Sequence, residues 1–333
     1  MNKIYNESMN MNKSNTNLIN LQKLINKEIL TQTHKHKYKK YLLISSVGKR
    51  SQHQLCDWNY SGKNYDLFLV YYEPNEKVDD EYFKINSDFY LHLYGKKMTH
   101  YYHIFQLNLI SYYDYIFILD NDNKISGMDI SKLFKLATKL DANILAPSIR
   151  IKNTDHKIVK KVITFYYKNI EMVNGNFWKL EKYLPTDLIK TYKTILEYTY
   201  WAQMVQISPL KDKYIKCTNF VEDGRYIIKR QILDKYRKNI DLMKKFKSGV
   251  MFDQLLCNFS EFKKIFICDY IYYIHMDPYK NKEEEQIEGN KIIKYVNKHK
   301  ILKNNFVELW PKIIRMKMFK LKDYHHKKKE CKF

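Results

Sequence analysis

Two aspartates separated by one residue, Asp120 and Asp122, follow directly after an apolar run at residues 115–119. Ligands of open parallel α/β sheets bind beyond the carboxyl ends of the strands. At such an edge both carboxylates of Asp120-Asn121-Asp122 can turn toward one hard divalent cation, Mn²⁺ or Mg²⁺, whose remaining ligands are commonly substrate phosphates. Because Asp and Asn are also favoured in turns, the spacing alone favours a turn, and a metal site needs support from other residues.

A lysine pair occupies a position where a phosphate group can bind. Lys96 and Lys97 follow Gly95, just before a predicted helix at residues 98–110 that leads into the strand before the two aspartates. A glycine and a lysine at a helix start bring backbone N–H groups and an ammonium group toward an anion. In a chain this rich in lysine, an exposed pair without a ligand is an equally good interpretation.

Three further side chains are candidates for proton transfer or metal binding. Glu222 interrupts an apolar run, and Asp253 lies near a predicted helix start, where an aspartate also interacts favourably with the helix dipole. His275 ends the apolar run at residues 271–274, where a single histidine usually has a structural role. Taken one by one, these positions indicate no particular reaction.

The elements that must position these side chains alternate between strands and helices. Runs in which every residue is apolar indicate strands buried on both faces, as in a mostly parallel sheet flanked by helices. The helix predicted at residues 130–140 has apolar residues at i, i+3, i+4, i+7 and i+10. The predicted strands are 41–45, 66–72, 115–119, 143–147, 226–229 and 265–275, and the other predicted helices include 98–110, 185–207, 231–246 and 292–301.

The composition of the two ends predicts three segments. Residues 1–39 are polar and rich in asparagine, and we expect a mobile leader there with at most a short helix at 18–29. We expect one catalytic domain at residues 40–280 and a helical extension with a basic tail at 281–333. The beginning has no apolar signal-peptide core, and no window approaches the ~18 apolar residues of a membrane span, so we expect a cytoplasmic protein. The five cysteines form no C-x-x-C pair, which favours reduced thiols.

The net charge of +23 on 333 residues would attract nucleic acid, anionic membranes or phosphorylated ligands. The lysines are spread along the chain and mixed with acidic residues, and no zinc-finger, RNA-binding or basic-zipper pattern is present. We therefore expect no specific nucleic-acid recognition, and a lysine surface that helps to retain an anionic ligand. The sequence also lacks a P-loop and a kinase-type glycine-rich loop, which argues against an ATPase or a kinase.

Several short motifs follow one another across residues 41–278. They are Ser46-Val47-Gly48 with His53 and Trp58, residues 65–72, Gly95-Lys96-Lys97, residues 113–122, Ala146-Pro147-Ser148, Phe220-Val221-Glu222, residues 249–253 and residues 269–275. Taken together and in this order, they resemble a family of glycosyltransferase-like proteins that was defined as a domain of unknown function and is similar to GT-A-fold enzymes. The family's acidic motif is usually three aspartates, whereas Asn121 replaces the middle one here, and the segment ending at Asp253 also departs from the family's Trp-Gly-x-Asp pattern.

This resemblance implies a GT-A-like, Rossmann-type α/β fold and a donor site for a nucleotide-diphosphate sugar. It implies that Asp122 is the principal ligand of Mn²⁺ or Mg²⁺, that Asp120 supports the ribose or the metal, and that His275 completes the metal or diphosphate shell. The nucleotide-binding and donor-binding residues it implies are Ser46, Val47, Gly48, Lys97 and Asp120.

For the reaction, the resemblance implies transfer of a hexosyl-type sugar to an acceptor hydroxyl. An inverting transfer needs a carboxylate to accept the hydroxyl proton, and Asp253 is the candidate base, with Glu222 as the alternate. Two other interpretations stay open: a catalytically silent relative that binds a glycan or a partner, which the substitution at Asn121 permits, and a basic protein associated with nucleic acid. The sequence identifies neither the sugar, the base, the acceptor nor the stereochemical course.

Overall fold

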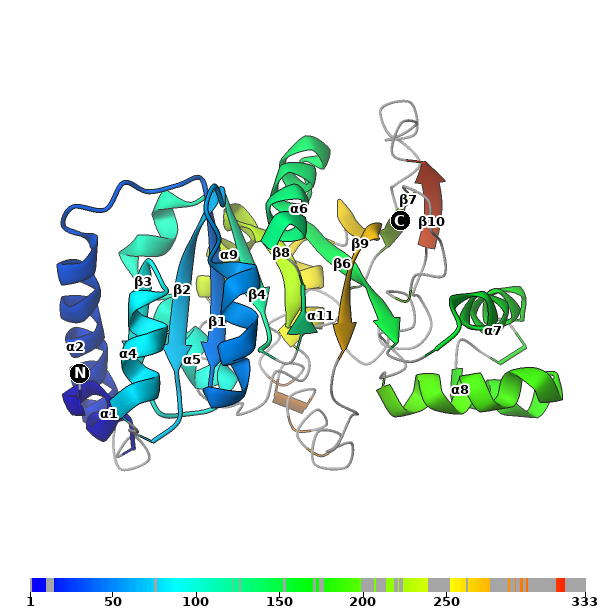
Figure 1. Ribbon diagram of the computed structural model, residues 1–333, viewed down its shortest axis with the longest axis horizontal. Coiled ribbons are helices and arrows are strands. Elements are labelled where there is room, and N and C mark those ends of the chain that lie inside the picture. Colours follow the sequence, from blue (N-terminus) through cyan, green and yellow to red (C-terminus); the bar gives the residue numbers. More distant parts are fainter. Residues whose placement is uncertain are drawn as a thin grey trace. The chain divides into compact units, whose positions relative to one another are not determined.

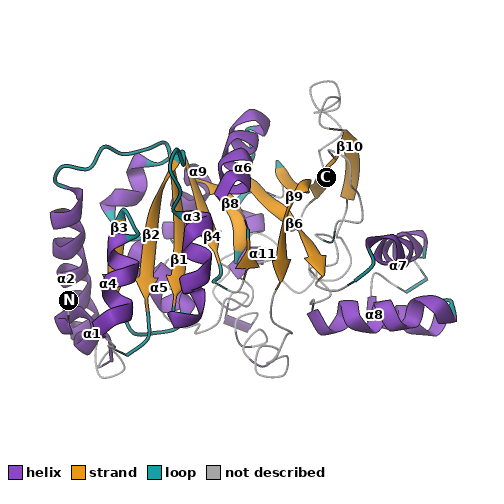
Figure 2. Ribbon diagram, in the orientation of Figure 1, coloured by secondary structure: helices purple, strands orange, loops and turns teal. Residues whose placement is uncertain are grey.

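A computed structural model of the 333-residue chain shows an α/β fold, a mostly parallel sheet flanked by helices (Figures 1 and 2), as the sequence predicted. The chain divides into two compact units that alternate along the sequence: unit 1 comprises Met1–Asn121, Ile125–Lys135 and Ile227–Gly249, and unit 2 comprises Asp122–Lys124, Leu136–Tyr226 and Val250–Phe333. The structure describes residues 2–9, 15–74, 77–121, 123–125, 127–151, 154–169, 172–173, 177–198, 207, 214–218, 221, 224–238, 252–261, 263–275, 287, 291, 294–295, 298 and 316–320.

Unit 1 is built on parallel strands. β1 pairs with both β2 and β4, and β2 pairs with β3, all in parallel. Every residue of β2 and of β4 is buried, and all of them except Asp66 are apolar or aromatic, as expected for strands covered on both faces. The order is β8-β4-β1-β2-β3, with bounds β1 (Tyr41–Val47), β2 (Tyr65–Tyr71), β3 (Phe89–His92), β4 (Tyr115–Leu119) and β8 (Arg225–Lys229), of which residues 227–229 belong to unit 1.

Helices cover this sheet (Figure 2). The helix predicted at residues 98–110 is shorter than expected. It is observed as α5 (Lys97–Ile104), and the separate 3-10 helix η3 (Asn108–Tyr112) follows a few residues later. The other helical elements with residues in unit 1 are η2 (Lys49–Gln54), α3 (Leu55–Trp58), α4 (Lys77–Ile85), α9 (Arg230–Arg237) and the first part of α6 (Gly127–Leu140).

Among the first 39 residues, predicted as a leader with at most a short helix, the described ones form the helices α1 (Asn2–Met9) and α2 (Asn15–Thr33). α2 buries Leu21, Ile25 and Ile29, which recur every four residues and therefore lie on one face of the helix. At its end, the Gln32 side chain bonds both backbone groups of Tyr90 on β3. α2 thus covers the outer edge of the unit 1 sheet, a role that the polar composition of the segment did not suggest.

Unit 2 contains the antiparallel part of the sheet. β9 pairs in parallel with β6, and antiparallel with β7 and with the two-residue β5, while β10 pairs antiparallel with β7. The register between β6 and β9 shifts after Pro147, so that Ser148 pairs with Tyr272. The bounds are β5 (Asn123–Lys124), β6 (Ile144–Ile151), β7 (Tyr214–Thr218), β9 (Ile265–His275) and β10 (Met316–Lys320), with α7 (His156–Lys168), η4 (Phe177–Tyr183), α8 (Thr186–Tyr198) and α11 (Phe252–Phe259).

Two further sequence expectations concern the whole chain. Within the part of the chain that the structure describes, no helix combines the length and the apolar character needed to cross a bilayer. The cysteines described there are free thiols: Cys56 is exposed, and Cys217, Cys257 and Cys268 are buried. The boundary expected at residue 280 falls outside the described residues, and the three-segment division stays a prediction.

Candidate functional site

The strand order of unit 1 creates a position where ligands of α/β proteins bind. From β1 the chain moves outward through β2 and β3, and it then returns to place β4 on the other side of β1. The carboxyl ends of β1 and β4 are therefore neighbours at a point where the direction of winding reverses, which is the usual ligand position in such sheets. Gly48 follows β1 there and Asp120 follows β4.

The end of β1 packs against the end of β2. The Val47 carbonyl accepts a hydrogen bond from the Tyr72 backbone N–H at 3.2 Å. A Cβ atom on Gly48 would lie 2.3 Å from Glu73 Oε1 and 2.8 Å from the Tyr72 hydroxyl oxygen. A side chain at position 48 therefore has to displace these groups, and glycine allows a carboxylate and a phenol to approach the backbone.

Ser46, on β1, is held by a buried histidine. Its hydroxyl oxygen lies 2.8 Å from Nδ1 of His100 on α5. Burial lowers the pKa of His100 to about 4, although a hydrogen bond with the Leu93 backbone acts in the opposite direction, so the ring is neutral at pH 7. The Tyr72 ring lies nearly parallel to this imidazole, with ring centroids 6.3 Å apart.

Lys97 and Asp120, predicted separately from the sequence, form an ion pair. Lys97 Nζ lies 3.1 Å from Asp120 Oδ2, and the two side chains are 26% and 21% exposed. Lys97 begins α5, and the preceding turn includes Gly95 at φ +145°, a backbone conformation that favours glycine. The turn after β3 thus delivers an ammonium group to the carboxylate that follows β4.

Asn121, which replaces the middle aspartate of the expected motif, connects three segments of unit 1. Its carbonyl accepts a hydrogen bond from Gln54 Nε2 at 2.7 Å, and its side-chain amide donates one to the Tyr72 hydroxyl at 3.2 Å. Because Tyr72 also lies against Gly48, the ends of β1, β2 and β4 meet around one tyrosine.

Sequence reasoning did not single out four of these residues. Tyr72 and Glu73 follow β2 in the way that Asp120 follows β4, and this position at the carboxyl end of an apolar run was the available signal. Gln54 and His100 lie on helices, where no local pattern marks a polar residue that faces a site.

The side chains of the remaining predicted residues are not described by the structure. Asp122 and Glu222 lie outside the described residues. Asp253 is the second residue of α11, and His275 ends β9, where its backbone pairs with Asn123. Both belong to unit 2, and nothing is described of their side chains, so their catalytic and metal-binding roles stay predictions.

The described part of the site combines several kinds of polar group. Glu73 and Asp120 supply carboxylates, Lys97 supplies an ammonium group, and a tyrosine, a serine and a neutral histidine supply uncharged groups. Carboxylates accept hydrogen bonds from hydroxyl groups, and an ammonium group attracts an anion. The arrangement therefore suits a ligand that carries both hydroxyl groups and negative charge.

Comparison with solved structures finds a remote similarity to TarS from S. aureus. The structure of TarS 1–349 in complex with UDP-GlcNAc aligns with a TM-score of 0.41 and 10% identity over 78% of this chain and 65% of that chain. A second structure of TarS 1–349 aligns with a TM-score of 0.40 and 9% identity over 78% of this chain and 64% of that chain. A structure of TarS aligns with a TM-score of 0.42 and 11% identity over 78% of this chain and 39% of that chain. In each case the match spans less than two thirds of TarS. No protein-family model and no curated protein matches the chain.

Proposed function

We propose that this chain is a metal-dependent glycosyltransferase that moves a sugar from a nucleotide-diphosphate donor to an acceptor hydroxyl. The observation that carries the proposal is that Gly48 and Asp120 follow two neighbouring strands, β1 and β4, at the winding reversal. Nucleotides bind at this position in doubly wound sheets. The loop after β1 has one glycine, not the three of the dinucleotide fingerprint, which favours a mononucleotide donor.

In this proposal the nucleoside binds over the ends of β1 and β2. Ser46, Val47 and Gly48 line its path, and the lack of a side chain at Gly48 lets the Glu73 carboxylate and the Tyr72 hydroxyl approach the backbone there. Glu73 accepts hydrogen bonds from the ribose hydroxyls, because a carboxylate at the end of the second strand, beside the first strand–helix turn, has this role in related nucleotide sites.

The diphosphate binds between Lys97 and the acidic motif. The Asp120 carboxylate is partly exposed and provides the oxygen ligands that Mn²⁺ and Mg²⁺ prefer, so it fits a metal site in which Asp122 and His275 are the other proposed ligands. The bound metal would neutralise charge on the departing nucleoside diphosphate. Lys97 pairs with Asp120 and adds positive charge for the phosphates.

For the acceptor hydroxyl, Asp253 is the proposed base and Glu222 the alternate. A general base must lie within hydrogen-bonding reach of the proton that it accepts. Substituting each by its amide separates these roles, because the variant of the true base should keep donor binding and lose transfer. We further propose a cytoplasmic location.

Nucleotide binding tests the donor site. We expect UDP or GDP to bind with Mn²⁺ and to lose affinity with EDTA or in Asp122→Ala. Lys97→Met removes a charged contact worth about 1.5–3 kcal/mol, so affinity should fall about 10- to 150-fold. Lys96→Met is the matched control, because Lys96 is the exposed neighbour at the same turn, and it should change affinity little. Equal effects of the two lysine variants, or no binding of either nucleotide with any metal, would refute the proposal.

A second candidate is a catalytically silent relative that binds a nucleotide or glycan. It is favoured by the contacts within the acidic motif, where the Asp120 carboxylate pairs with Lys97 and the Asn121 amide bonds a tyrosine hydroxyl. Release of UDP or GDP from nucleotide sugars separates the candidates. Binding without metal-stimulated hydrolysis or transfer for any donor would favour the silent relative.

A further inference from the structure

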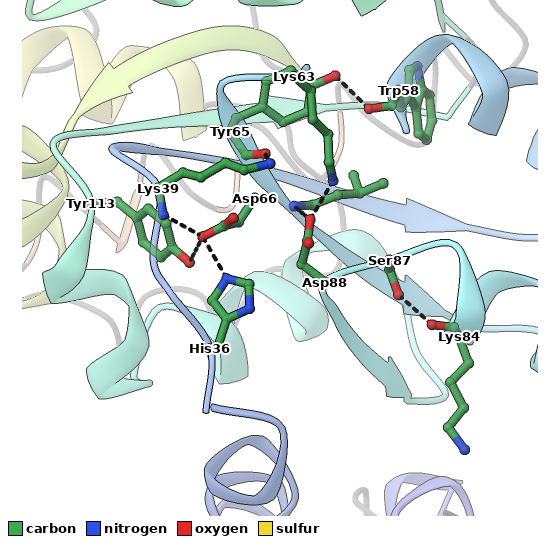
Figure 3. Close-up of polar contacts among 11 residues, drawn as sticks. His36, Lys39, Trp58, Lys63, Tyr65, Asp66, Lys84, Ser87, Asp88 and Tyr113 are labelled. Carbon is green, nitrogen blue, oxygen red and sulfur yellow. Dashed lines mark hydrogen bonds and ion pairs between the residues drawn. The ribbon is translucent and has the colours of Figure 1, made fainter. Parts of the chain in front are cut away.

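The amino-terminal end of β2 carries a second polar cluster, formed by His36, Asp66 and Asp88 (Figure 3). Asp66 is the second residue of β2, whereas Glu73 follows its end, so about 20 Å of strand separates this cluster from the proposed donor site. One ligand-type atom from each of the three side chains lies within 4.8 Å of the others. The three residues come from the segment before β1, from β2 and from the segment before β3.

His36 is held in place by aromatic neighbours. Its ring packs edge-on against Phe89 at a centroid distance of 4.7 Å and against Tyr38 at 5.3 Å. This packing places Nε2 at 3.1 Å from Asp66 Oδ2. Figure 3 marks this contact with a dashed line. The backbone N–H of Lys39 and the hydroxyl of Tyr113 donate to the same Asp66 oxygen, at 3.0 and 2.8 Å.

Two atoms of this cluster have no hydrogen-bond partner within the described part of the chain. Asp66 is fully buried, and its other oxygen, Oδ1, makes no hydrogen bond; His36 Nε2 is also buried and makes none with acceptable geometry. Buried polar atoms without a partner are rare and indicate a bound water, an ion or strain. Because both atoms belong to good metal ligands, the cluster has the features of a cation site.

We propose that His36, Asp66 and Asp88 bind a divalent transition-metal ion of the zinc class. One imidazole nitrogen and two carboxylate oxygens form a ligand set that suits Zn²⁺ or Co²⁺ better than Mg²⁺, which prefers oxygen ligands alone. In a tetrahedral zinc site with bonds near 2.0–2.1 Å, ligand atoms lie about 3.3 Å apart. The pair formed by His36 and Asp66 is already close to this spacing, at 3.1 Å.

Asp88 has to supply most of the remaining adjustment. Closing the widest spacing from 4.8 Å to the tetrahedral value requires a movement of up to about 1.5 Å, and Asp88 is the most exposed of the three side chains, at 24%. Its hydrogen bonds from Lys63 and from the Leu67 N–H both end on Oδ2, which leaves Oδ1 for the metal. Lys63 is a competing cation, so metal binding has to overcome its charge.

A metal at this position would fasten the N-terminal helices to the sheet. His36 lies three residues after the end of α2, and the two aspartates lie on β2 and just before β3. The role is structural: the ion would link three segments that are far apart in sequence, independently of any nucleotide. An ordered water that bridges the two unpartnered atoms is the alternative occupant.

Metal titration of the nucleotide-free protein tests the site. We expect one equivalent of Zn²⁺ to raise the melting temperature and one equivalent of Co²⁺ to give the visible absorption of tetrahedral cobalt, whereas Mg²⁺ should do neither. His36→Gln or Asp88→Asn should weaken Zn²⁺ binding more than about 100-fold, because loss of an outer-shell partner alone costs 10- to 100-fold. Asp66 is left intact because it is fully buried.

Three further variants make the test specific. His34→Gln removes an exposed histidine from the same segment and should leave Zn²⁺ affinity unchanged, as should Asp122→Ala at the proposed donor site. Lys63→Met removes the competing cation and should tighten binding. The proposal is overturned if Zn²⁺ and Co²⁺ produce neither signal, if the His36 and His34 variants bind equally, or if Mg²⁺ binds as well as Zn²⁺.

Discussion

The contact of Gln32 with Tyr90 leads to a sharp prediction about how the N-terminal helices stabilise unit 1. Gln32 Nε2 donates to the Tyr90 carbonyl at 2.9 Å, and the Tyr90 N–H donates to Gln32 Oε1 at 2.8 Å. β3 is the last strand in the sheet order, so among the residues that the structure describes no strand lies beside these backbone groups on that side. One glutamine side chain therefore takes the place of a strand, and Gln32→Leu removes both hydrogen bonds while keeping a similar volume.

The expected magnitude follows from these two bonds. Each neutral hydrogen bond contributes about 1 kcal/mol, so the variant should lower the free energy of opening β3 by about 2 kcal/mol. Because Tyr90 is only 2% exposed, its amide and carbonyl are left without water as a substitute, which makes this figure a lower bound. A change of 2 kcal/mol corresponds to about 30-fold in an equilibrium constant.

Hydrogen exchange of the Tyr90 amide is the direct assay, and we expect it to be about 30-fold faster in Gln32→Leu. Gln32→Glu is the matched control, because a carboxylate still accepts from the Tyr90 N–H but cannot donate to its carbonyl, so the amide should stay protected. Repulsion from Glu28 in that variant costs only a few tenths of a kcal/mol. An exchange rate in Gln32→Leu within twofold of the unmodified protein would refute the reasoning.

Three other predictions concern the proposed donor site and the buried cluster. In Gly48→Ala the new methyl group displaces the neighbouring carboxylate, so nucleotide affinity by calorimetry should fall about tenfold or more with the loss of one charged hydrogen bond; an unchanged affinity would place the nucleoside elsewhere. Burial lowers the pKa of His100 from 6.5 to about 4, so as the pH falls the unfolded chain binds a proton on this histidine before the folded chain does. The free energy of unfolding should therefore decrease by about 3 kcal/mol between pH 6.5 and pH 4. Urea unfolding of His100→Gln should lack that part of the decline. Tyr113→Phe removes a buried bond to the Asp66 carboxylate and should destabilise unit 1 by about 1.5–3 kcal/mol, whereas Tyr112→Phe, at an exposed position, should unfold as the unmodified protein does.

Local patterns were sufficient to predict three of the strands of unit 1. The apolar runs at residues 41–45, 66–72 and 115–119 became β1, β2 and β4, because strands buried on both faces need apolar residues at consecutive positions. The same patterns placed Asp120 at the end of a strand. Helix ends were less well predicted, since the apolar residues of 98–110 continue from α5 into η3 without marking the boundary.

The attachment of α2 is a feature that composition alone does not reveal. Residues 1–39 are polar, yet α2 needs only one apolar face, and Gln32 completes its attachment through hydrogen bonds to a strand that lies 58 positions further along the chain. A glutamine in a polar segment gives no signal of such a partner, because the partner is a backbone group whose position depends on the folded sheet.

By itself, the sequence determined the α/β class, the principal strands of unit 1 and the candidate acidic motif, because these depend on neighbouring residues along one strand or one helix. Only the tertiary structure decided that β4 lies beside β1, that Lys97 pairs with Asp120, and that His36 meets Asp66 and Asp88. The physical reason is that strand order and long-range side-chain contacts follow from how the elements pack together. The residues around a given position in the chain do not indicate which distant residues it will contact.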